Sequence, residues 1–276
     1  DHVFPDVPKL QHNIAAVTAY LRKQIEEKHG VLNLIPTLDG NTYYYSEVLG
    51  YWRVYDYIEN SVCLQQPESP EDFYQSAIAF GTFQQQLKDF PAHTLYETIP
   101  NFHNTPDRYR IFQEVLARDP LGRVKDAREE IEFALAREEI GGSLYQMLQA
   151  GQLPLRVTHN DTKLNNVMLR ADSRTPLCVI DLDTTMPGLS AYDFGDAIRF
   201  AANRAAEDEP DLSKVGLEID RFRAFAEGFI PEVAPALLPI EIKTLALGAF
   251  VMTVEVAVRF LDDYITGDQY FKTRYR

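Results

Sequence analysis

The stretch Leu155-Arg-Val-Thr-His-Asn-Asp-Thr-Lys-Leu-Asn-Asn-Val-Met-Leu169 is the most informative part of this sequence. Its polar centre, His159-x-Asp161-x-Lys163-x-x-Asn166, is followed directly by the apolar residues 167–169. A second apolar run, Val179-Ile180, ends at Asp181. The pattern predicts short strands whose ends bring acidic and amide side chains into loops, where functional sites usually lie. A loop of turn-forming residues is the alternative interpretation, because Asp and Asn favour turns.

The order and spacing of Asp161, Asn166 and Asp181 are typical of a kinase catalytic loop and the metal-binding aspartate that follows it. Phosphoryl transfer depends mainly on positioning and on neutralising charge. We expect Asp161 to accept or orient the proton of an acceptor hydroxyl, and Lys163 to offset charge on the transferred group. Asn166 and Asp181 offer the oxygen ligands that Mg²⁺ prefers, with ATP phosphates as further ligands. His159 is expected to brace the loop by hydrogen bonds.

Composition limits the class of protein. The 276 residues are 45% hydrophobic and 25% charged, as in ordinary globular proteins. A net charge of -14 argues against nucleic acid and anionic membranes as partners. The longest apolar runs, such as Thr244 to Val258, are interpreted as too short and interrupted to span a bilayer, and the Asp-His start does not read as a signal peptide. Cys63 and Cys178 are expected to be reduced core thiols, which favours a cytoplasmic location.

Hydrophobic periodicity predicts an α+β protein with two regions. Residues 1–59 are expected to hold a helix from Asp6 to Gly30 and then strands at 31–36, 42–48 and 51–58. A connector near 59–70 leads into a larger, mainly helical region, 60–276, with a short β insert at 153–185. The helices predicted there span Ser69 to Pro91, 106–118, 123–138, 142–150, 191–203, 212–230 and 238–265.

These motifs resemble the aminoglycoside phosphotransferase and choline kinase superfamily, relatives of protein kinases, and more narrowly the bacterial N-acetylhexosamine 1-kinases. The matching stretches are 157–166, 179–188 and 192–200, with weaker matches at 52–55 and 258–264. The likeness extends along nearly the whole chain. It implies a two-lobed, protein-kinase-like fold with a small partial α/β N-terminal lobe on the nucleotide side and a larger, mainly helical C-terminal lobe.

The resemblance also implies an activity. The chain would be an ATP- and Mg²⁺-dependent kinase that phosphorylates the anomeric hydroxyl of GlcNAc or GalNAc. Asp161 would be the catalytic base, with Asn166 and Asp181 as the Mg²⁺ ligands. The other positions carried over are Arg259 and Tyr270 for the sugar, Tyr57 and Ile58 for the adenine pocket at the connector, and Asp193 for support of the catalytic loop.

The sequence departs from the kinase pattern near its ends. It contains no G-x-G-x-x-G and no obvious strand lysine, it starts at what is expected to be the first helix of the small lobe, and it stops where the family usually continues into another helix. Either a longer protein supplies the phosphate-covering hairpin or that function is absent. A kinase for another small alcohol (aminoglycoside, choline or another sugar) and a non-catalytic kinase-like binding protein are therefore alternatives. A protein kinase fits less well, because Leu-Asp rather than Phe-Gly follows Asp181.

Several single residues have two interpretations. Asp183 is either a turn cap before Thr184 and Thr185 or a second carboxylate of the metal or phosphate site. Asp193 and Asp196 read as carboxylates at a helix N-terminus, where the helix dipole favours them. Glu255 and Arg259 have the spacing of a surface ion pair on a helix, against the sugar-binding role that the resemblance gives Arg259. The tyrosines and tryptophan between 43 and 55 are expected to pack on a sheet.

Overall fold

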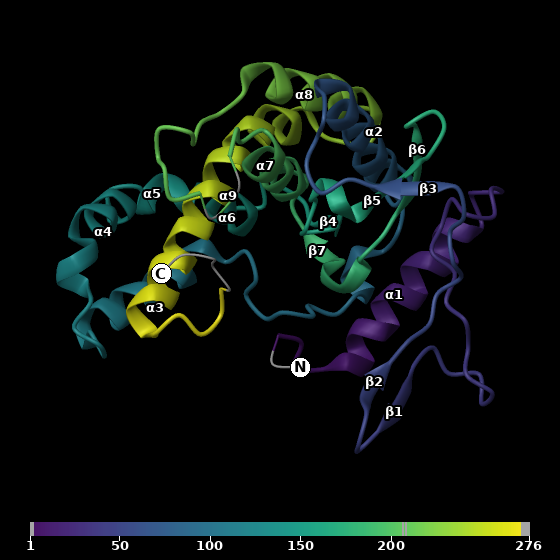
Figure 1. Ribbon diagram of the computed structural model, residues 1–276, viewed down its shortest axis with the longest axis horizontal. Coiled ribbons are helices and arrows are strands. Elements are labelled where there is room, and N and C mark those ends of the chain that lie inside the picture. Colours follow the sequence, from purple (N-terminus) through teal and green to yellow (C-terminus); the bar gives the residue numbers. More distant parts are fainter. Residues whose placement is uncertain (1–2, 206, 208, 272–276) are drawn as a thin grey trace.

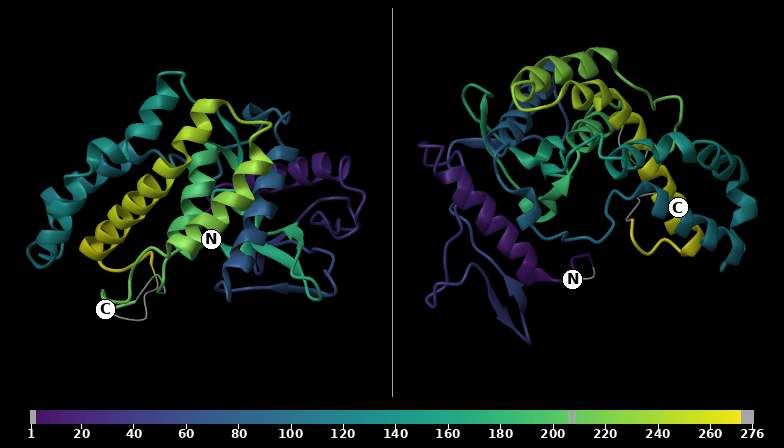
Figure 2. Two further views of the ribbon diagram at one scale, coloured as in Figure 1. Left: turned by 90° about the horizontal axis from the view of Figure 1, so that it is seen from above. Right: turned by 180° about the vertical axis from the view of Figure 1, so that it is seen from behind.

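The computed structural model describes residues 3–205, 207 and 209–271. A small lobe on one side carries α1 (Val7–Arg22), β1 (Tyr44–Ser46) and β2 (Gly50–Trp52), and a larger helical lobe forms the rest (Figure 1). Seen from behind, α1 and the β1–β2 hairpin lie on one side of the molecule and α3 to α6 on the other (Figure 2). The short strands and loops of 153–188 lie between them.

The elements of the helical lobe follow the predicted order. Its first half contains α2 (Pro70–Gln86), η1 (Ala92–Thr94), α3 (Thr105–Arg118), η2 (Val124–Ala127), α4 (Arg128–Leu135), α5 (Glu138–Gly141) and α6 (Ser143–Gln149). The β insert contains β4 (Arg156–Thr158), η3 (Leu164–Asn166), β5 (Val167–Arg170), β6 (Pro176–Val179), η4 (Leu182–Thr184) and β7 (Met186–Gly188). The chain ends in α7 (Ser190–Ala201), α8 (Ile219–Val233) and α9 (Pro239–Thr266).

Helix α1 starts as predicted but is shorter. Asp6 caps it by accepting a hydrogen bond from the Lys9 amide at 3.1 Å. The helix stops at Arg22, whose guanidinium donates to the carbonyls of Glu27 at 3.0 Å and Val31 at 2.6 Å. These bonds hold the following segment in a turn against the helix end. The prediction of a helix as far as Gly30 is therefore wrong.

The predicted strands of the small lobe are mostly absent from the described residues. The hairpin pairs Tyr45 with Tyr51, but segments 31–36 and 51–58 meet only at an isolated bridge between Leu34 and Tyr55. Tyr45 and Trp52 are 52% and 60% exposed, so these aromatic side chains do not pack on a sheet as expected. Within the described part of the chain the hairpin has two strands, and the Tyr45 and Tyr51 rings contact each other in a tilted arrangement, with 4.5 Å between their centroids.

Two small sheets support the polar loops. In the first, β3 (Ser61–Cys63), β5 and β6 lie side by side and antiparallel, with Val167 opposite Val179. In the second, β4 pairs with β7. Cys63 and Cys178 both lie opposite Met168, on strands separated by β5, and both are free thiols as predicted. Cys178 is buried and Cys63 half-buried.

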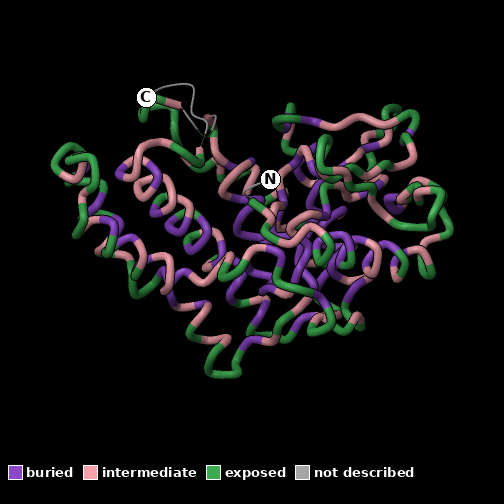
Figure 3. The backbone as a smooth tube through the Cα atoms, turned by 90° about the horizontal axis from the view of Figure 1, so that it is seen from below, coloured by how far each residue is buried: buried purple, intermediate pink, exposed green. Residues whose placement is uncertain are grey.

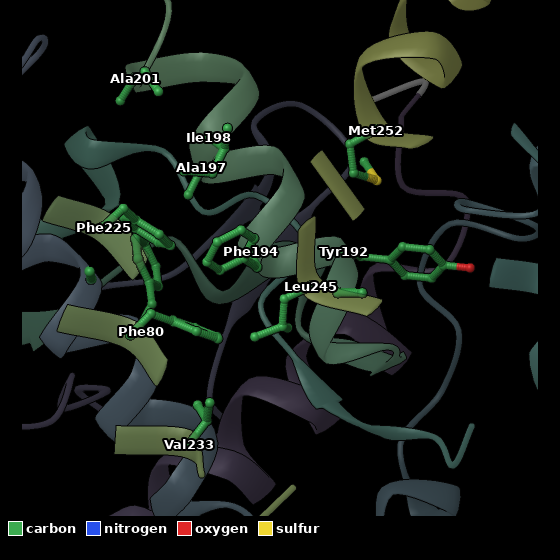
Figure 4. Packing of buried hydrophobic residues seen from close by; sticks show 14 of the residues in the cluster. Phe80, Tyr192, Phe194, Ala197, Ile198, Ala201, Phe225, Val233, Leu245 and Met252 are labelled. Atoms are coloured by element: carbon green, nitrogen blue, oxygen red, sulfur yellow. The ribbon is translucent and has the colours of Figure 1, made fainter. Parts of the chain in front are cut away.

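The core of the large lobe forms where α2 packs on α8 and α7 packs on α9. Phe194 points toward Phe80 and Phe225, whereas Tyr192 on the same helix points away from them (Figure 4). Buried residues gather toward the centre of the molecule, and exposed residues dominate the peripheral turns (Figure 3). Helix α8 starts at Ile219, later than the predicted 212, because the preceding segment pairs with the end of α7 through a bridge between Asn203 and Leu217.

Helix α9 is long and apolar enough to cross a membrane, judged by length and composition alone. The prediction that this apolar region is too short and interrupted to span a bilayer is therefore wrong for Pro239–Thr266. In the fold, α9 packs along α7 and α3, with Leu245, Val251 and Val258 buried. It also carries the buried carboxylate of Glu255. Both features are those of a core helix.

Candidate active site

The loop after β4 is held by backbone hydrogen bonds to one buried carboxylate of α7. Asp193 accepts from the amides of His159 at 3.0 Å and Asn160 at 2.7 Å, and the Gln84 side chain donates to it at 2.6 Å. Asn160 has a φ of 63°, the left-handed conformation that Asn tolerates better than most residues. Burial raises the pKa of Asp193, and the amide hydrogen bonds oppose this by stabilising the charged form.

Asp161, Lys163 and Asn166 meet in the loop as the sequence predicts. Lys163 Nζ lies 2.9 Å from one carboxylate oxygen of Asp161, and Asn166 Nδ2 donates to the other at 3.0 Å. Burial opposes the charge on Lys163, but the Asp161 carboxylate outweighs it and raises the pKa of the lysine. The Asp161 side chain is 28% exposed, so a ligand can reach it.

The backbone brings Asp181 next to this group. The Ile180 amide donates to the Asn166 carbonyl at 2.9 Å, and Asp181 follows in a left-handed conformation with a φ of 56°. Asp181 is exposed, and its carboxylate forms no hydrogen bond or ion pair with any residue that the structure describes. Asp183, two positions on, forms an ion pair with Arg53 of the small lobe. Among the described residues the Asp183 side chain forms no capping hydrogen bond with Thr184 or Thr185, and its role as a carboxylate of the metal or phosphate site stays a prediction.

His159 braces the loop from below. Its ring is buried, and Nε2 lies 2.9 Å from the Ile180 carbonyl. The rings of Phe80 and Phe83 contact it edge-on. The imidazole therefore fixes the loop of residues 159–166 against the segment that carries Asp181, and it is not exposed to a ligand.

Arg259 and Tyr270 also meet, in a separate cavity of about 430 Å³. The Arg259 guanidinium donates to the Tyr270 hydroxyl at 3.2 Å and lies 5.5 Å from the centre of the Phe102 ring. The cavity is open to solvent and is lined by α3, the C-terminal end of α9, the segment after it and residues before α3. Arg108 and Asp262 line it together with these three residues.

The predicted surface ion pair between Glu255 and Arg259 does not form. Glu255 is fully buried and accepts hydrogen bonds from His103 Nδ1 at 2.9 Å and Thr105 Oγ1 at 2.6 Å. Burial opposes its charge, but the charge of His103 and these hydrogen bonds lower the pKa of Glu255. The bonds attach the 102–105 segment to α9 one turn before Arg259. Tyr192, beside Asp193, donates to the His103 carbonyl at 3.3 Å, so this segment also contacts the helix that holds the catalytic loop.

The predicted adenine-pocket residues have different environments. Tyr57 is 83% exposed, whereas Ile58 is buried in the small lobe. The Ile58 carbonyl accepts a hydrogen bond from Ser61 Oγ at 2.7 Å. Their role in binding adenine stays a prediction.

Sequence reasoning missed three residues of this region. Arg53 lies in the weakly matching stretch 52–55, yet its guanidinium forms an ion pair with Asp183, in the segment that carries Asp181. Arg108 lies in the cavity with Arg259, and its position on α3 gave no periodic or motif signal. Asp196 was interpreted as a helix-terminal carboxylate, but it accepts a hydrogen bond from the Thr162 amide. Contacts between residues that are far apart in the chain, such as Arg53 with Asp183, cannot be predicted from a single sequence.

The donor atoms present fit Mg²⁺. Asn166 uses its Nδ2 to bind Asp161, which leaves Oδ1 without a described partner, and the Asp181 carboxylate is equally unengaged. Among the described residues, no group of three or more His, Cys, Asp or Glu side chains is placed to hold a metal. One amide and one carboxylate leave most Mg²⁺ positions to other oxygens, as in sites that the ion shares with nucleotide phosphates.

The fold is similar to those of several solved structures. These include a microcompartment-associated aminopropanol kinase, with 15% sequence identity, a TM-score of 0.54 and coverage of 97% of this chain and 75% of that chain. A choline/ethanolamine kinase family protein from Mesorhizobium loti has 15% identity, a TM-score of 0.53 and coverage of 95% and 73%. The GDP complex of aminoglycoside 2'-phosphotransferase-IIIa has 11% identity, a TM-score of 0.58 and coverage of 95% and 77%.

These likenesses define the class: the chain has the predicted two-lobed, protein-kinase-like α+β fold. The sequence model of the phosphotransferase enzyme family, APH, matches residues 7–225, and the chain therefore belongs to that family. The resemblance to this superfamily is confirmed. The family transfers a phosphoryl group from ATP, with Mg²⁺, to an alcohol. The narrower likeness to N-acetylhexosamine kinases stays a prediction.

Proposed function

We propose that this chain phosphorylates the anomeric hydroxyl of N-acetylhexosamines, GlcNAc or GalNAc, with ATP and Mg²⁺. The observation that supports catalysis is the group of Asp161, Lys163 and Asn166, joined by bonds of 2.9 and 3.0 Å, with the unengaged Asp181 carboxylate following Ile180. An intact group of this kind favours an enzyme over a non-catalytic binding protein. Free thiols at Cys63 and Cys178 fit a reducing compartment such as the cytoplasm.

Each residue has a role in the proposed reaction. The acceptor oxygen forms a bond to the γ-phosphorus while the bond to the ADP oxygen breaks, and Asp161 takes the hydroxyl proton. Lys163 offsets negative charge on the transferred group. Asn166 and Asp181 would hold Mg²⁺, which supplies further neutralisation of the phosphates. His159 positions the loop, as does Asp193.

We also propose a division of labour between the lobes. Residues 1–59 form the nucleotide side, with Tyr57 and Ile58 at the connector close to the adenine. Residues 60–276 carry the catalytic loop and the acceptor site. The ion pair between Arg53 and Asp183 joins the two parts beside Asp181.

The cavity at Arg259 and Tyr270 supports a neutral sugar as the acceptor. The Arg108 and Arg259 guanidiniums offer donors, Asp262 offers an acceptor, and neither guanidinium forms an ion pair with a described carboxylate. Aromatic rings of Phe102 and Tyr270 form part of the wall. This mixture of donors, acceptors and apolar faces suits a polyol with an amide. A second carboxylate, Asp263, also lines the cavity, but it accepts hydrogen bonds from the backbone amides of residues 269–271, so a cationic acceptor would face two guanidiniums and one remaining carboxylate.

An acceptor panel tests the proposal. GlcNAc, GalNAc, glucose, glucosamine, choline and kanamycin are each incubated with ATP and Mg²⁺, ADP release is followed, and products are identified by phosphorus NMR. We expect 1-phosphates of GlcNAc or GalNAc at the highest kcat/KM, and a raised KM for these sugars in Arg259→Met. Turnover of kanamycin or choline but not of GlcNAc would assign the site to a cationic alcohol. Nucleotide binding without turnover of any acceptor would support the non-catalytic alternative.

A further inference from the structure

Two carboxylates of α7, Asp193 and Asp196, accept hydrogen bonds from backbone amides of the catalytic loop. Asp193 takes the amides of His159 and Asn160, as described above. Asp196, one turn later, accepts from the Thr162 amide through Oδ2 at 3.0 Å. Thr162 lies between Asp161 and Lys163, so this bond fixes the peptide that joins the two charged side chains of the loop.

The other oxygen of Asp196 is also engaged. Asp196 Oδ1 accepts from Arg199 Nε at 3.2 Å and from Nη2 at 2.9 Å, and Arg199 forms a second ion pair with Glu207. The side chains of Asp196 and Arg199 are only 8% and 11% exposed. Burial opposes the charge of Asp196, but Arg199 and then Lys163 outweigh it and lower the pKa of this carboxyl group. The buried Asp196 carboxylate thus interacts favourably with two cations, each of which has a second acidic partner, Glu207 for Arg199 and Asp161 for Lys163.

A purely structural role explains these contacts less well. The helix dipole acts on charges within the first turn, and α7 begins at Ser190, so Asp193 falls in that turn and Asp196 does not. An ordinary Asp–Arg pair at this spacing is exposed, as Asp220 and Arg223 are on α8. Taking a carboxylate out of water is costly, and in Asp196 it is compensated partly by an amide of the catalytic loop.

We propose that Asp196 is a positioning residue for phosphoryl transfer, which fixes the peptide between Asp161 and Lys163 and keeps the Lys163 ammonium beside the Asp161 carboxylate. The inference rests on the proposed roles of these two residues. If Asp196 carried no charge, Arg199 and Lys163 would both lose a buried negative charge that stabilises them. With an amide in its place, one of the donors Thr162 N–H and Arg199 loses its acceptor.

A double-mutant cycle tests whether Asp196 acts through Lys163. Single-turnover rates are compared for the wild type, Asp196→Asn, Lys163→Met and the double variant. We expect Asp196→Asn to lower the rate roughly tenfold in the wild-type background but less than about twofold beside Lys163→Met, because residues that belong to one network of hydrogen bonds and ion pairs couple by this order of free energy. Asp220→Asn, which removes a carboxylate at the same spacing from Arg223, is the control and should leave the rate unchanged. Equal losses in both backgrounds would refute the proposal.

Amide hydrogen exchange gives a second readout that needs neither nucleotide nor turnover. In Asp196→Ala, which removes both acceptor oxygens, the Thr162 amide should exchange at least about tenfold faster, while the His159 and Asn160 amides stay protected by Asp193. A merely structural role in α7 would change the exchange of all three amides together, and unchanged exchange at Thr162 would also overturn the inference. Because this measurement is independent of activity, it still decides if Lys163→Met is too slow to assay or if the proposed acceptor is wrong.

Discussion

Asp161 has its two carboxylate oxygens bound to different partners, Lys163 at 2.9 Å and Asn166 at 3.0 Å. These contacts orient the Asp161 carboxylate, and its partly exposed side chain is not part of the hydrophobic core. We therefore expect Asp161 to affect the reaction rate far more than the stability of the fold. We predict that Asp161→Asn lowers kcat by about 10²–10⁴, the usual contribution of a general base. Steady-state kinetics with thermal unfolding of the same samples measures both effects. A turnover within tenfold of wild type would contradict the proposed role.

Asp181 combines a chemical and a conformational requirement. Its φ of 56° is accessible to Asp and Asn and costs other non-glycine residues about 1–2 kcal/mol. We therefore predict that Asp181→Asn keeps the fold but removes the charge that we propose binds Mg²⁺, so that much more Mg²⁺ is needed for half-maximal activity. Titration of Mg²⁺ in the presence of ATP measures the change, with Asp172→Asn as the control, because Asp172 is an exposed aspartate of the β5–β6 turn. An unaltered Mg²⁺ titration would exclude Asp181 as a ligand.

At the scale of elements, the α7–α9 contact positions the catalytic loop. The two helices approach so closely that a Cβ on Gly248 would lie 2.0 Å from the Ala191 carbonyl oxygen, and one on Gly195 would lie 2.3 Å from the Gly248 oxygen. Backbone atoms cannot move aside as side chains do. The helices must therefore separate if either glycine is replaced, and Asp193 and Asp196 would move with α7.

Gly248→Ala is predicted to destabilise the protein. Alanine gains about 1 kcal/mol in helix propensity, but overpacking costs about 1–3 kcal/mol or more, and here the clash is with backbone. The free energy of unfolding in urea should fall, and kcat should fall with it. Gly216→Ala is the matched control, because a Cβ there meets its nearest atoms only at 3.7 Å. A neutral or stabilising Gly248→Ala would show that the helices separate at little cost.

At the scale of the molecule, the sequence predicted the parts whose signals are local. Helical periodicity located α2, α7 and α9 to within a few residues, and the motif at 159–166 identified side chains that do meet. The strand predicted at 51–58 is present only in its first two residues, which belong to β2, and it meets segment 31–36 only at the bridge between Leu34 and Tyr55, because apolar, β-branched residues extend a strand only where the pairing continues. The links from Arg53 to Asp183 and from Glu255 to His103 were not predictable, because each joins residues far apart in sequence.

Alkaline stability depends on acidic groups from both parts of the chain. Burial raises the pKa of Cys178 from 9.0 to about 12, and burial raises that of Tyr55 from 10.0 to about 12. The folded protein keeps these protons at a pH where the unfolded chain releases them. The stability is therefore fully present below pH 9 and is lost as the pH rises toward 12, by about 1.4 kcal/mol per pH unit for each proton that differs.

Urea unfolding measured from pH 8 to 11 checks this prediction. Cys178→Ala and Tyr55→Phe should flatten the pH dependence, whatever they do to the absolute stability. Tyr55→Phe is the cleaner variant, because the Tyr55 hydroxyl is buried without a described partner and its removal breaks no hydrogen bond. If the double variant lost stability with pH as steeply as the wild type, other groups would control alkaline unfolding, and neither Cys178 nor Tyr55 would titrate as its burial implies.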